Sequence, residues 1–209
     1  MASRPSRRLE LIDLGVASVA PDGQVESGDL YIAKCDSRLG LLAAIDGIGH
    51  GKGAAAASRA AAASLESHFT DPLIPLIQEC HEALRSTRGV VLSASSIDFQ
   101  NNTLAWLGVG NVQGLLIRSA NSPYGRNQSL LLRPGVVGSR LPALQTATLP
   151  FSPGDTLVFA TDGIRSDFAD DDLFAHESPQ RSADRILAKY YKGNDDALVL
   201  VARLLGESQ

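Results

Sequence analysis

The stretch LGLLAAIDGIGHGKGAAAASRAAAASLESHF, residues 39–69, carries the pattern from which the fold can be read most directly. Leu39–Ile45 is a continuous apolar run with the length of a strand, and it ends at Asp46. The glycines within Gly47–Gly53 predict a loop. Ala54–Phe69 is rich in alanine and contains neither glycine nor proline, so it predicts a helix. The small side chains of this helix suit close packing against a sheet.

The flanking sequence is dominated by strand-like segments. Leu9–Val19 and Leu30–Cys35 have strand-like patterns, and the turn signal Pro21-Asp22-Gly23 between them predicts a hairpin. Apolar residues at helical spacing predict a second helix near Leu76–Leu84 and a third near Ala183–Tyr190. Further strands are predicted at Val90–Phe99, Thr103–Val109, Val112–Arg118, Ser129–Arg133, Thr156–Thr161 and Ala197–Leu204. Strands outnumber helices, which predicts an α+β fold with mainly antiparallel sheets.

Composition limits the class of protein. A length of 209 residues suits one domain that spans residues 1–209, and a hydrophobic content of 44% is typical of globular proteins. The chain lacks an apolar run of roughly 20 residues, so we expect no membrane partner. A formal net charge of -4 argues against nucleic acid as a partner. Cys35 and Cys80 have neither metal-binding spacing nor disulfide density, so we expect a reducing, cytoplasmic compartment.

Four aspartates stand at the edges of predicted strands: Asp29, Asp46, Asp162 and Asp195. Strand ends are rigid, so they can hold carboxylates in the fixed positions that a preorganised site requires. A glycine follows both Asp46 and Asp162, which gives the backbone unusual freedom and leaves the Gly47 carbonyl available as a further ligand. An Asp-Gly pair alone is more often an ordinary turn. The repetition of the pattern is what favours a common site.

Convergence of these carboxylates would require a cation. Two carboxylates ~4 Å apart at an effective dielectric constant near 20 repel each other by about 4 kcal/mol. A set of oxygen ligands without clustered histidine or cysteine favours Mg²⁺ or Mn²⁺ over zinc. A pair of such ions lowers the pKa of a bridging water and clamps a phosphoryl group during in-line attack. The pattern therefore indicates hydrolysis of phosphate esters.

The glycine-rich loop also invites a nucleotide-binding interpretation, which its details oppose. A P-loop would require glycine at position 46 and serine or threonine at position 53, and neither is present. A dinucleotide fingerprint expects a second parallel strand soon after the helix, but a second predicted helix follows instead. Because the loop opens a helix, its amides are suited to holding an anionic phosphoryl group. His50 is either a proton donor or phosphate ligand there, or a structural hydrogen-bonding residue.

The motifs together resemble the bacterial branch of protein phosphatase 2C, which includes the sporulation stage II E type phosphatases. Ala44–Gly51 and the alanine-rich segment after it resemble the first metal motif of that family, and Ser27–Asp29 resembles its early Gly-Asp motif. Phe159–Ile164 and Asn194–Asp196 resemble the two later motifs. Leu107–Val112 resembles one subgroup in particular, the feedback phosphatases of the sigma-B stressosome pathway.

This resemblance implies a four-layer αββα sandwich of two antiparallel sheets with helices outside. It implies that Asp46 is shared by two metal ions, Mn²⁺ or Mg²⁺, and that Gly47 contributes its carbonyl oxygen. Asp162 and Asp195 would complete one metal site, and Asp29 would support the other. Asp46, Asp162 and Asp195 are accordingly the catalytic residues that it implies. The implied reaction is hydrolysis of phosphoserine and phosphothreonine by a metal-activated water. The implied partners are phosphorylated STAS-domain scaffold and antagonist proteins of the stressosome.

The sequence departs from the family pattern at one position and leaves two other functions open. Leu198 stands where the family usually has a threonine, and either Asp195 or Asp196 can be matched to the last metal ligand. One alternative function is a pseudophosphatase that binds phosphorylated STAS proteins without turnover. The other is a metal-dependent phosphatase of small molecules. The polar segment Ala120–Gln128 is a candidate flap over the substrate.

Overall fold

The computed structural model describes residues 7–9, 11–20, 26–170 and 177–206, and within them the strands form two sheets. The first sheet contains, in spatial order, β1 (Arg7–Leu9), β2 (Ile12–Val19), β12 (Ala197–Leu204), β11 (Thr156–Ala160), β7 (Gln113–Ile117) and β8 (Gln128–Ser129). The second contains β10 (Ala147–Pro150), β6 (Thr103–Val109), β5 (Val90–Asp98), β4 (Leu39–Gly47) and β3 (Asp29–Cys35). The two-residue strand β9 (Leu132–Arg133) lies parallel to β6, and the other pairings are antiparallel.

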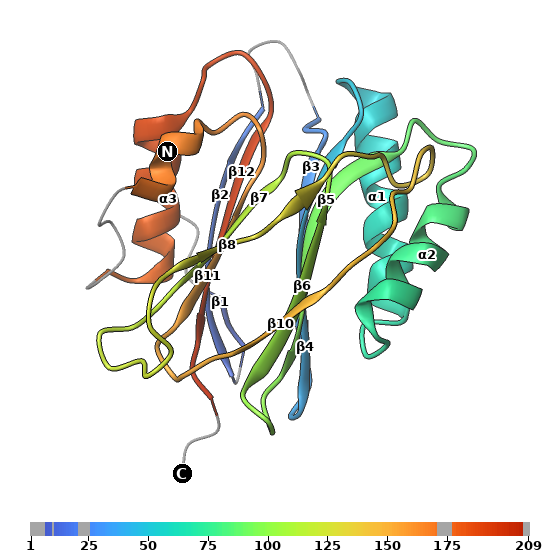
Figure 1. Ribbon diagram of the computed structural model, residues 1–209. Helices are drawn as coiled ribbons and strands as arrows, with labels where there is room; N and C mark the ends of the chain where they lie inside the picture. Colours follow the sequence, from blue (N-terminus) through green and yellow to red (C-terminus); the bar gives the residue numbers. More distant parts are fainter. Residues whose placement is uncertain (1–6, 10, 21–25, 171–176, 207–209) are drawn as a thin grey trace.

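Helices cover the outer faces of both sheets, as Figure 1 shows. Helices α1 (Lys52–Ser67) and α2 (Leu73–Ala83) pack on the second sheet through a common apolar cluster. Helix α3 (Pro179–Tyr190) packs on the first sheet, next to the short 3-10 helix Ser166–Asp170. The prediction of an αββα sandwich is therefore confirmed. None of the described helices combines the length and the apolar character needed to cross a bilayer.

Strand β4 shows why its sequence is apolar at successive positions. Leu42 and Ala44 belong to the core between the two sheets, whereas Leu41, Ala43 and Ile45 belong to the core under α1 and α2. Successive side chains of a strand point to opposite faces, and here both faces are buried. The continuous apolar run is thus the signature of a strand with helices on one side and a second sheet on the other.

The predicted hairpin of Leu9–Val19 with Leu30–Cys35 is wrong. β2 pairs with β1 and with β12, and β3 pairs with β4 in the other sheet. The turn signal Pro21-Asp22-Gly23 lies outside the described residues. The alternating pattern indicates that each segment is a strand, but it contains no information about the sheet to which a strand belongs.

The segment predicted as one strand at Ser129–Arg133 crosses between the sheets. Its first part, β8, pairs with β7 in the first sheet, and its last part, β9, pairs with β6 in the second. β7 also lies in the first sheet, although β5 and β6, which precede it in the chain, form a hairpin in the second. Strand β10 and the 3-10 helix carried no recognised sequence signal.

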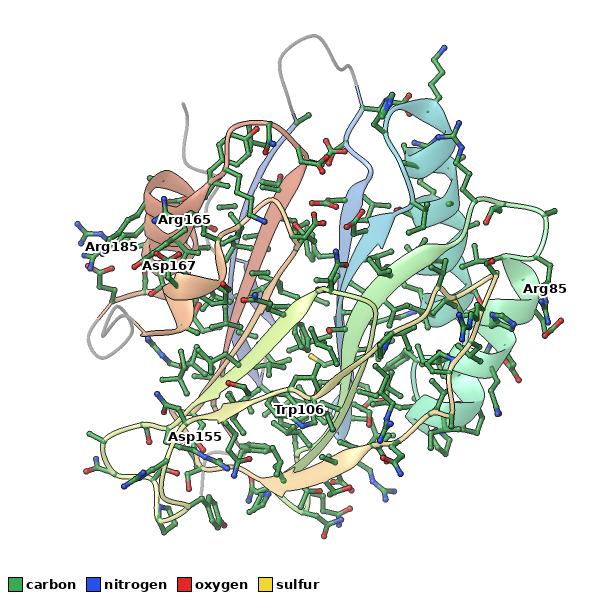
Figure 2. All side chains as sticks on the ribbon, turned by 45° about the horizontal axis from the view of Figure 1, so that its top comes forward. Arg85, Trp106, Asp155, Arg165, Asp167 and Arg185 are labelled. Atoms are coloured by element: carbon green, nitrogen blue, oxygen red, sulfur yellow. The ribbon has the colours of Figure 1, made fainter. Side chains whose placement is uncertain are left out.

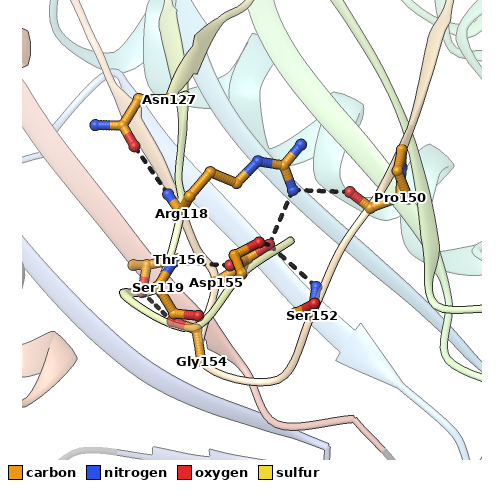
Figure 3. Close-up of polar contacts among 9 residues, drawn as sticks. Arg118, Ser119, Asn127, Pro150, Ser152, Gly154, Asp155 and Thr156 are labelled. Atoms are coloured by element: carbon orange, nitrogen blue, oxygen red, sulfur yellow. Dashed lines mark hydrogen bonds and ion pairs between the residues drawn. The ribbon is translucent and has the colours of Figure 1, made fainter. Parts of the chain in front are cut away.

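A buried carboxylate anchors one end of the sandwich. Asp155 is fully buried, and its side chain accepts hydrogen bonds from Arg118 Nη1 and Ser119 N at 2.8 Å and from Ser152 N at 3.0 Å (Figure 3). The Arg118 side chain is itself 4% exposed, and its Nη1 also donates to the Pro150 carbonyl at 2.8 Å. One ion pair therefore joins the loop after β7 to the turn before β11.

We expect Asp155→Ala to lower the free energy of unfolding by about 3–5 kcal/mol, because it leaves the Arg118 charge buried without its partner. The matched control is Asp167→Ala, which breaks the Arg165–Asp167 pair, whose side chains are 49% and 57% exposed. That change should cost less than about 1 kcal/mol. Figure 2 shows both carboxylates. Urea denaturation measures the two values, and equal losses would contradict the importance of burial.

Candidate metal centre

Two of the four predicted aspartates come from neighbouring strands of the second sheet. Asp46 follows Leu42 and Ala44 at two-residue spacing, so it shares their side of β4 and faces the gap between the sheets. Asp29 opens β3 and lies directly opposite Asp46 in the antiparallel register. Asp29 is 4% exposed, whereas Asp46 is partly exposed. The two carboxylates thus occupy one end of the inner face of this sheet.

The first sheet contributes acidic residues at the same end. Asp162 lies just beyond the end of β11, and Asp195 lies just before β12, its antiparallel neighbour. Asp46, Asp162 and Asp195 line a single cavity of about 620 Å³, together with His50 and Asn111. The structure therefore brings three of the predicted residues to one cavity, whereas Asp29, next to Asp46 on the neighbouring strand, is not among the residues that line it.

Two hydrogen bonds join the sheets beside this cavity. Thr161 Oγ1 donates to Asp29 Oδ2 at 2.7 Å, and Gly28 N donates to Asp196 Oδ2 at 2.8 Å. Thr161 Oγ1 also accepts a hydrogen bond from Leu198 N at 2.8 Å. The side chain of Leu198 packs in the core between the sheets, and the buried hydroxyl beside the carboxylates belongs to Thr161. Leu198, which replaces the threonine usual in the family, therefore contributes a core side chain and its backbone N–H, and the hydroxyl that contacts Asp29 comes from Thr161.

The adjacent residues Asp195 and Asp196 differ in environment. Asp195 is exposed and lines the cavity, and its Oδ1 accepts a hydrogen bond from Asp196 N at 2.9 Å. Asp196 is 5% exposed, and its Oδ2 is engaged by Gly28. Its Oδ1 is buried and has no hydrogen-bond partner within the part of the chain that the structure describes. The geometry therefore favours Asp195 as the carboxylate of the cavity and Asp196 as a link between the sheets.

Two residues of the site, Asn111 and Thr161, were not predicted from the sequence. Asn111 Nδ2 donates to Asp162 Oδ2 at 2.8 Å, which fixes the orientation of that carboxylate. Asn111 lies within Leu107–Val112, the segment that resembles the stressosome subgroup, but no role of its own was predicted for it. Thr161 continues the inward-facing positions Leu157 and Phe159 of β11, so the two-residue alternation was the signal that could have placed it on the inner face.

Gly47 is required by the packing of α1 against β4. A Cβ atom at this position would lie 2.3 Å from the Ala54 carbonyl oxygen, so the first turn of α1 leaves no space for a side chain. Gly47 N donates to the Gly28 carbonyl at 3.2 Å, which ties the end of β4 to the segment before β3. The role of the Gly47 carbonyl as a metal ligand stays a prediction.

The cavity places its carboxylates in an unfavourable electrostatic environment. Burial, followed by repulsion from Asp46, raises the pKa of Asp29 to about 8, although the hydrogen bond from Thr161 opposes the shift. Burial, followed by repulsion from Asp162 and then Asp195, raises the pKa of Asp46 to about 7. A positive charge in the cavity would relieve both effects, since an opposite charge favours the ionised form.

The oxygen ligands of the cavity are of the kind that a hard divalent cation prefers, although their positions do not form a complete coordination shell. Among the described residues, no three histidine, cysteine, aspartate or glutamate side chains form a group tight enough to hold a metal ion as they stand. Asp46, Asp162 and Asp195 nevertheless share one cavity, and repulsion from Asp162 and Asp195 raises the pKa of Asp46. Their carboxylate oxygens are the ligands that Mg²⁺ and Mn²⁺ prefer.

The raised pKa values predict that the metal-free protein becomes less stable as the pH rises. Both carboxyl groups bind a proton more tightly in the folded chain than in the unfolded chain, where the pKa is about 4. Their contribution to stability is fully present below about pH 4 and is lost as the pH rises through about 7 to 8. We expect the melting temperature, measured in chelator, to fall between about pH 5 and about pH 8, and Mn²⁺ to restore it.

Asp29→Asn should flatten this slope. The control is Asp36→Asn, because backbone hydrogen bonds from Leu39 and Arg38 lower the pKa of the exposed Asp36 and keep it ionised throughout that range. The control should retain the slope of the parent protein. An unchanged slope in Asp29→Asn would contradict the assignment.

Comparisons with known proteins agree with this fold. One solved chain, described as "The bacterial stressosome: a modular system that has been adapted to control secondary messenger signaling", is 32% identical with a TM-score of 0.84, and the match covers 93% of this chain and all of that one. A crystal structure of RsbX in complex with magnesium is 23% identical with a TM-score of 0.83, over 96% of this chain and 98% of that one. Magnesium is one of the two metals that the sequence predicts.

The curated phosphoserine phosphatase RsbX of Bacillus subtilis (strain 168) is 26% identical over 155 residues, which are 74% of this chain and 76% of the relative. Residues 36–205 match the family described as stage II sporulation protein E. This span runs from the end of β3 to the residue after β12, so it includes Asp46, Asp162 and Asp195. The chain therefore belongs to the stage II sporulation protein E (SpoIIE) family of PP2C-type phosphatases.

Proposed function

We propose that this chain is an active metal-dependent phosphoserine and phosphothreonine protein phosphatase, and that its substrates are phosphorylated STAS-domain proteins of the stressosome. The observation that carries the proposal is the single cavity lined by Asp46, Asp162 and Asp195, contributed by both sheets. The choice of substrate is supported by the relatives, one a curated phosphoserine phosphatase and another described with the bacterial stressosome. We infer that the chain resets a stress signal in the cytoplasm.

The proposed metal ligands combine the three carboxylates of the cavity with the roles that the family resemblance implies for Gly47 and Asp29. Asp46 would be shared by two divalent cations, with the Gly47 carbonyl as a further ligand. Asp162 and Asp195 would complete one site, and the buried Asp29 would support the other. When bound, the cations supply an activated water and stabilise the charge of the transferring phosphoryl group.

Other residues of the chain keep the carboxylates in place. Asn111 holds Asp162 through its amide, and Thr161 holds Asp29 through its hydroxyl. Residues that orient metal ligands in this way contribute strongly to metal affinity in other sites. His50 is exposed at the cavity, where its imidazole can bind the phosphoryl group or give a proton to the departing seryl oxygen.

We expect Mn²⁺-dependent release of phosphate from a phosphoserine STAS protein, and a loss of at least about a hundredfold in kcat/KM for Asp46→Asn. The expectation follows because a shared ligand supports several kcal/mol of charge stabilisation, and about 1.4 kcal/mol corresponds to a factor of ten. Phosphate release is the measurement, and a melting curve checks that the variant folds. Binding of the phosphoprotein without any Mn²⁺-dependent turnover would establish the pseudophosphatase alternative instead. Turnover of phosphometabolites alone would establish the small-molecule alternative.

Substitutions of Asp195 and Asp196 should have different effects, the first on metal affinity and the second on stability. We expect Asp195→Ala to weaken Mn²⁺ binding at least about tenfold, measured by calorimetry, with a melting temperature near that of the parent. Asp196→Ala should instead cost about 1–3 kcal/mol of stability, because it leaves the Gly28 amide buried without its acceptor. The reverse pattern would assign the metal ligand to Asp196.

A further inference from the structure

Arg88 is held beside the glycine-rich loop by its neighbours in the chain. It lies between α2 and β5, and the next residue, Gly89, accepts a hydrogen bond from Ile48 N at 3.1 Å. Thr87 Oγ1 donates to the Leu84 carbonyl at 2.8 Å and accepts from Gly89 N at 3.0 Å. The backbone on both sides of Arg88 is therefore fixed against α2 and against the loop that follows Asp46.

The guanidinium group of Arg88 lies close to two glycines, Gly49 of that loop and Gly53 of the first turn of α1. A Cβ atom at Gly53 would be 2.8 Å from Arg88 Cζ and Nε, and one at Gly49 would be 3.0 Å from Nη1. Gly49 has a φ of +90°, so its backbone already requires glycine. Gly53 lies within α1, where glycine is about 1 kcal/mol less favourable than alanine. The three atoms nearest to a Cβ at Gly53 all belong to the Arg88 guanidinium, so glycine at this position leaves room for that group.

Within the described part of the chain, the charge of Arg88 has no acidic partner. Arg88 is exposed, and no hydrogen bond or ion pair joins it to any residue that the structure describes. Arg85, three residues earlier, pairs with Glu82 at 3.2 Å on the outer face of α2 (Figure 2). The described lining of the metal cavity includes Gly49 and three aspartates but neither lysine nor arginine. The guanidinium thus provides a positive charge at the rim of an acidic cavity.

We propose that Arg88 is a rim subsite that binds an acidic side chain flanking the phosphorylated residue of the protein substrate. This proposal rests on the proposed protein phosphatase function. A guanidinium recognises a carboxylate through paired N–H donors, and Arg88 is not among the residues that line the cavity, although Gly49 beside it is. The subsite would favour acidic protein segments over small phosphate esters, because only a protein segment extends from the cavity to its rim.

The test compares two phosphoserine peptides that differ only in having aspartate or alanine on both sides of the phosphoserine. With Mn²⁺ at low ionic strength, we expect Arg88→Gln to lower kcat/KM for the acidic peptide by about fivefold, the factor that corresponds to an exposed ion pair of about 1 kcal/mol. The alanine peptide and p-nitrophenyl phosphate should be turned over as by the parent. The difference should shrink in high salt, which screens exposed charges.

Two further variants separate a specific subsite from a general effect of charge. Arg85→Gln removes an equal charge that already has a partner, so the preference for the acidic peptide should persist. Gly53→Ala should displace the guanidinium and lower turnover of the acidic peptide as Arg88→Gln does, while the melting temperature stays equal or rises. The double variant Arg88→Gln with Gly53→Ala should show no further loss.

Equal losses on both peptides, or an unchanged preference in Arg88→Gln, would overturn the subsite. Failure of the parent protein to hydrolyse either peptide would overturn the proposed function instead. In that case fluorescence anisotropy of the labelled peptides still tests the subsite, since Arg88→Gln must weaken binding of the acidic peptide and leave binding of the alanine peptide unchanged.

Discussion

The site depends on the alternation of side chains in two sheets that are packed face to face. In β4, Leu42 and Ala44 face the core between the sheets, and the same spacing brings Asp46 to the end of that inner face. In β11, Leu157 and Phe159 also face this core, and the same two-residue spacing brings Thr161 to the end of the inner face. Because both series end at the same edge of the sandwich, the apolar core stops there and polar groups from distant parts of the chain meet. The hydrogen bond from Thr161 to Asp29, 132 residues apart in sequence, is the direct result.

The two ends of the sandwich show how the surroundings of a buried carboxylate decide its role. Asp155 receives an arginine and several N–H donors from the protein, so its charge is compensated within the fold. Asp46 has acidic neighbours instead, and burial and repulsion raise its pKa to about 7. A carboxylate that the fold leaves uncompensated at a cavity is suited to bind a cation, whereas a paired one is tied to its partner, whose charge would stay buried and unpaired without it.

Local patterns predicted the elements well and their partners poorly. The predicted bounds of β6 and β12 agree with the structure. The pairing of β2 with β12 joins opposite ends of the chain, and no local pattern encodes it. The predicted substrate flap at Ala120–Gln128 is wrong.

This loop follows β7 at the end of the strand where Ile117 pairs with Thr156. The other end of β7 lies near the metal cavity, because Gln113 pairs there with Ala160, two residues before Asp162. The loop therefore lies at the end of the sandwich opposite the connection between β4 and α1, as Figure 1 shows, and the residues of that connection line the cavity.

The aspartates could be found from sequence because a motif names them, whereas no sequence signal gave a role to Asn111 or to Arg88. Asn111 and Arg88 lie in ordinary loops, and their importance comes from what they contact: Asp162 in one case and the glycine loop in the other. Selectivity between substrates depends on residues other than the proposed metal-binding aspartates.

Carboxylates around a metal act on the phosphoryl group that every phosphate ester shares, so they give little preference for one substrate over another. Discrimination between proteins must come from contacts outside the cavity, and the uncompensated charge at its rim is where such a contact begins.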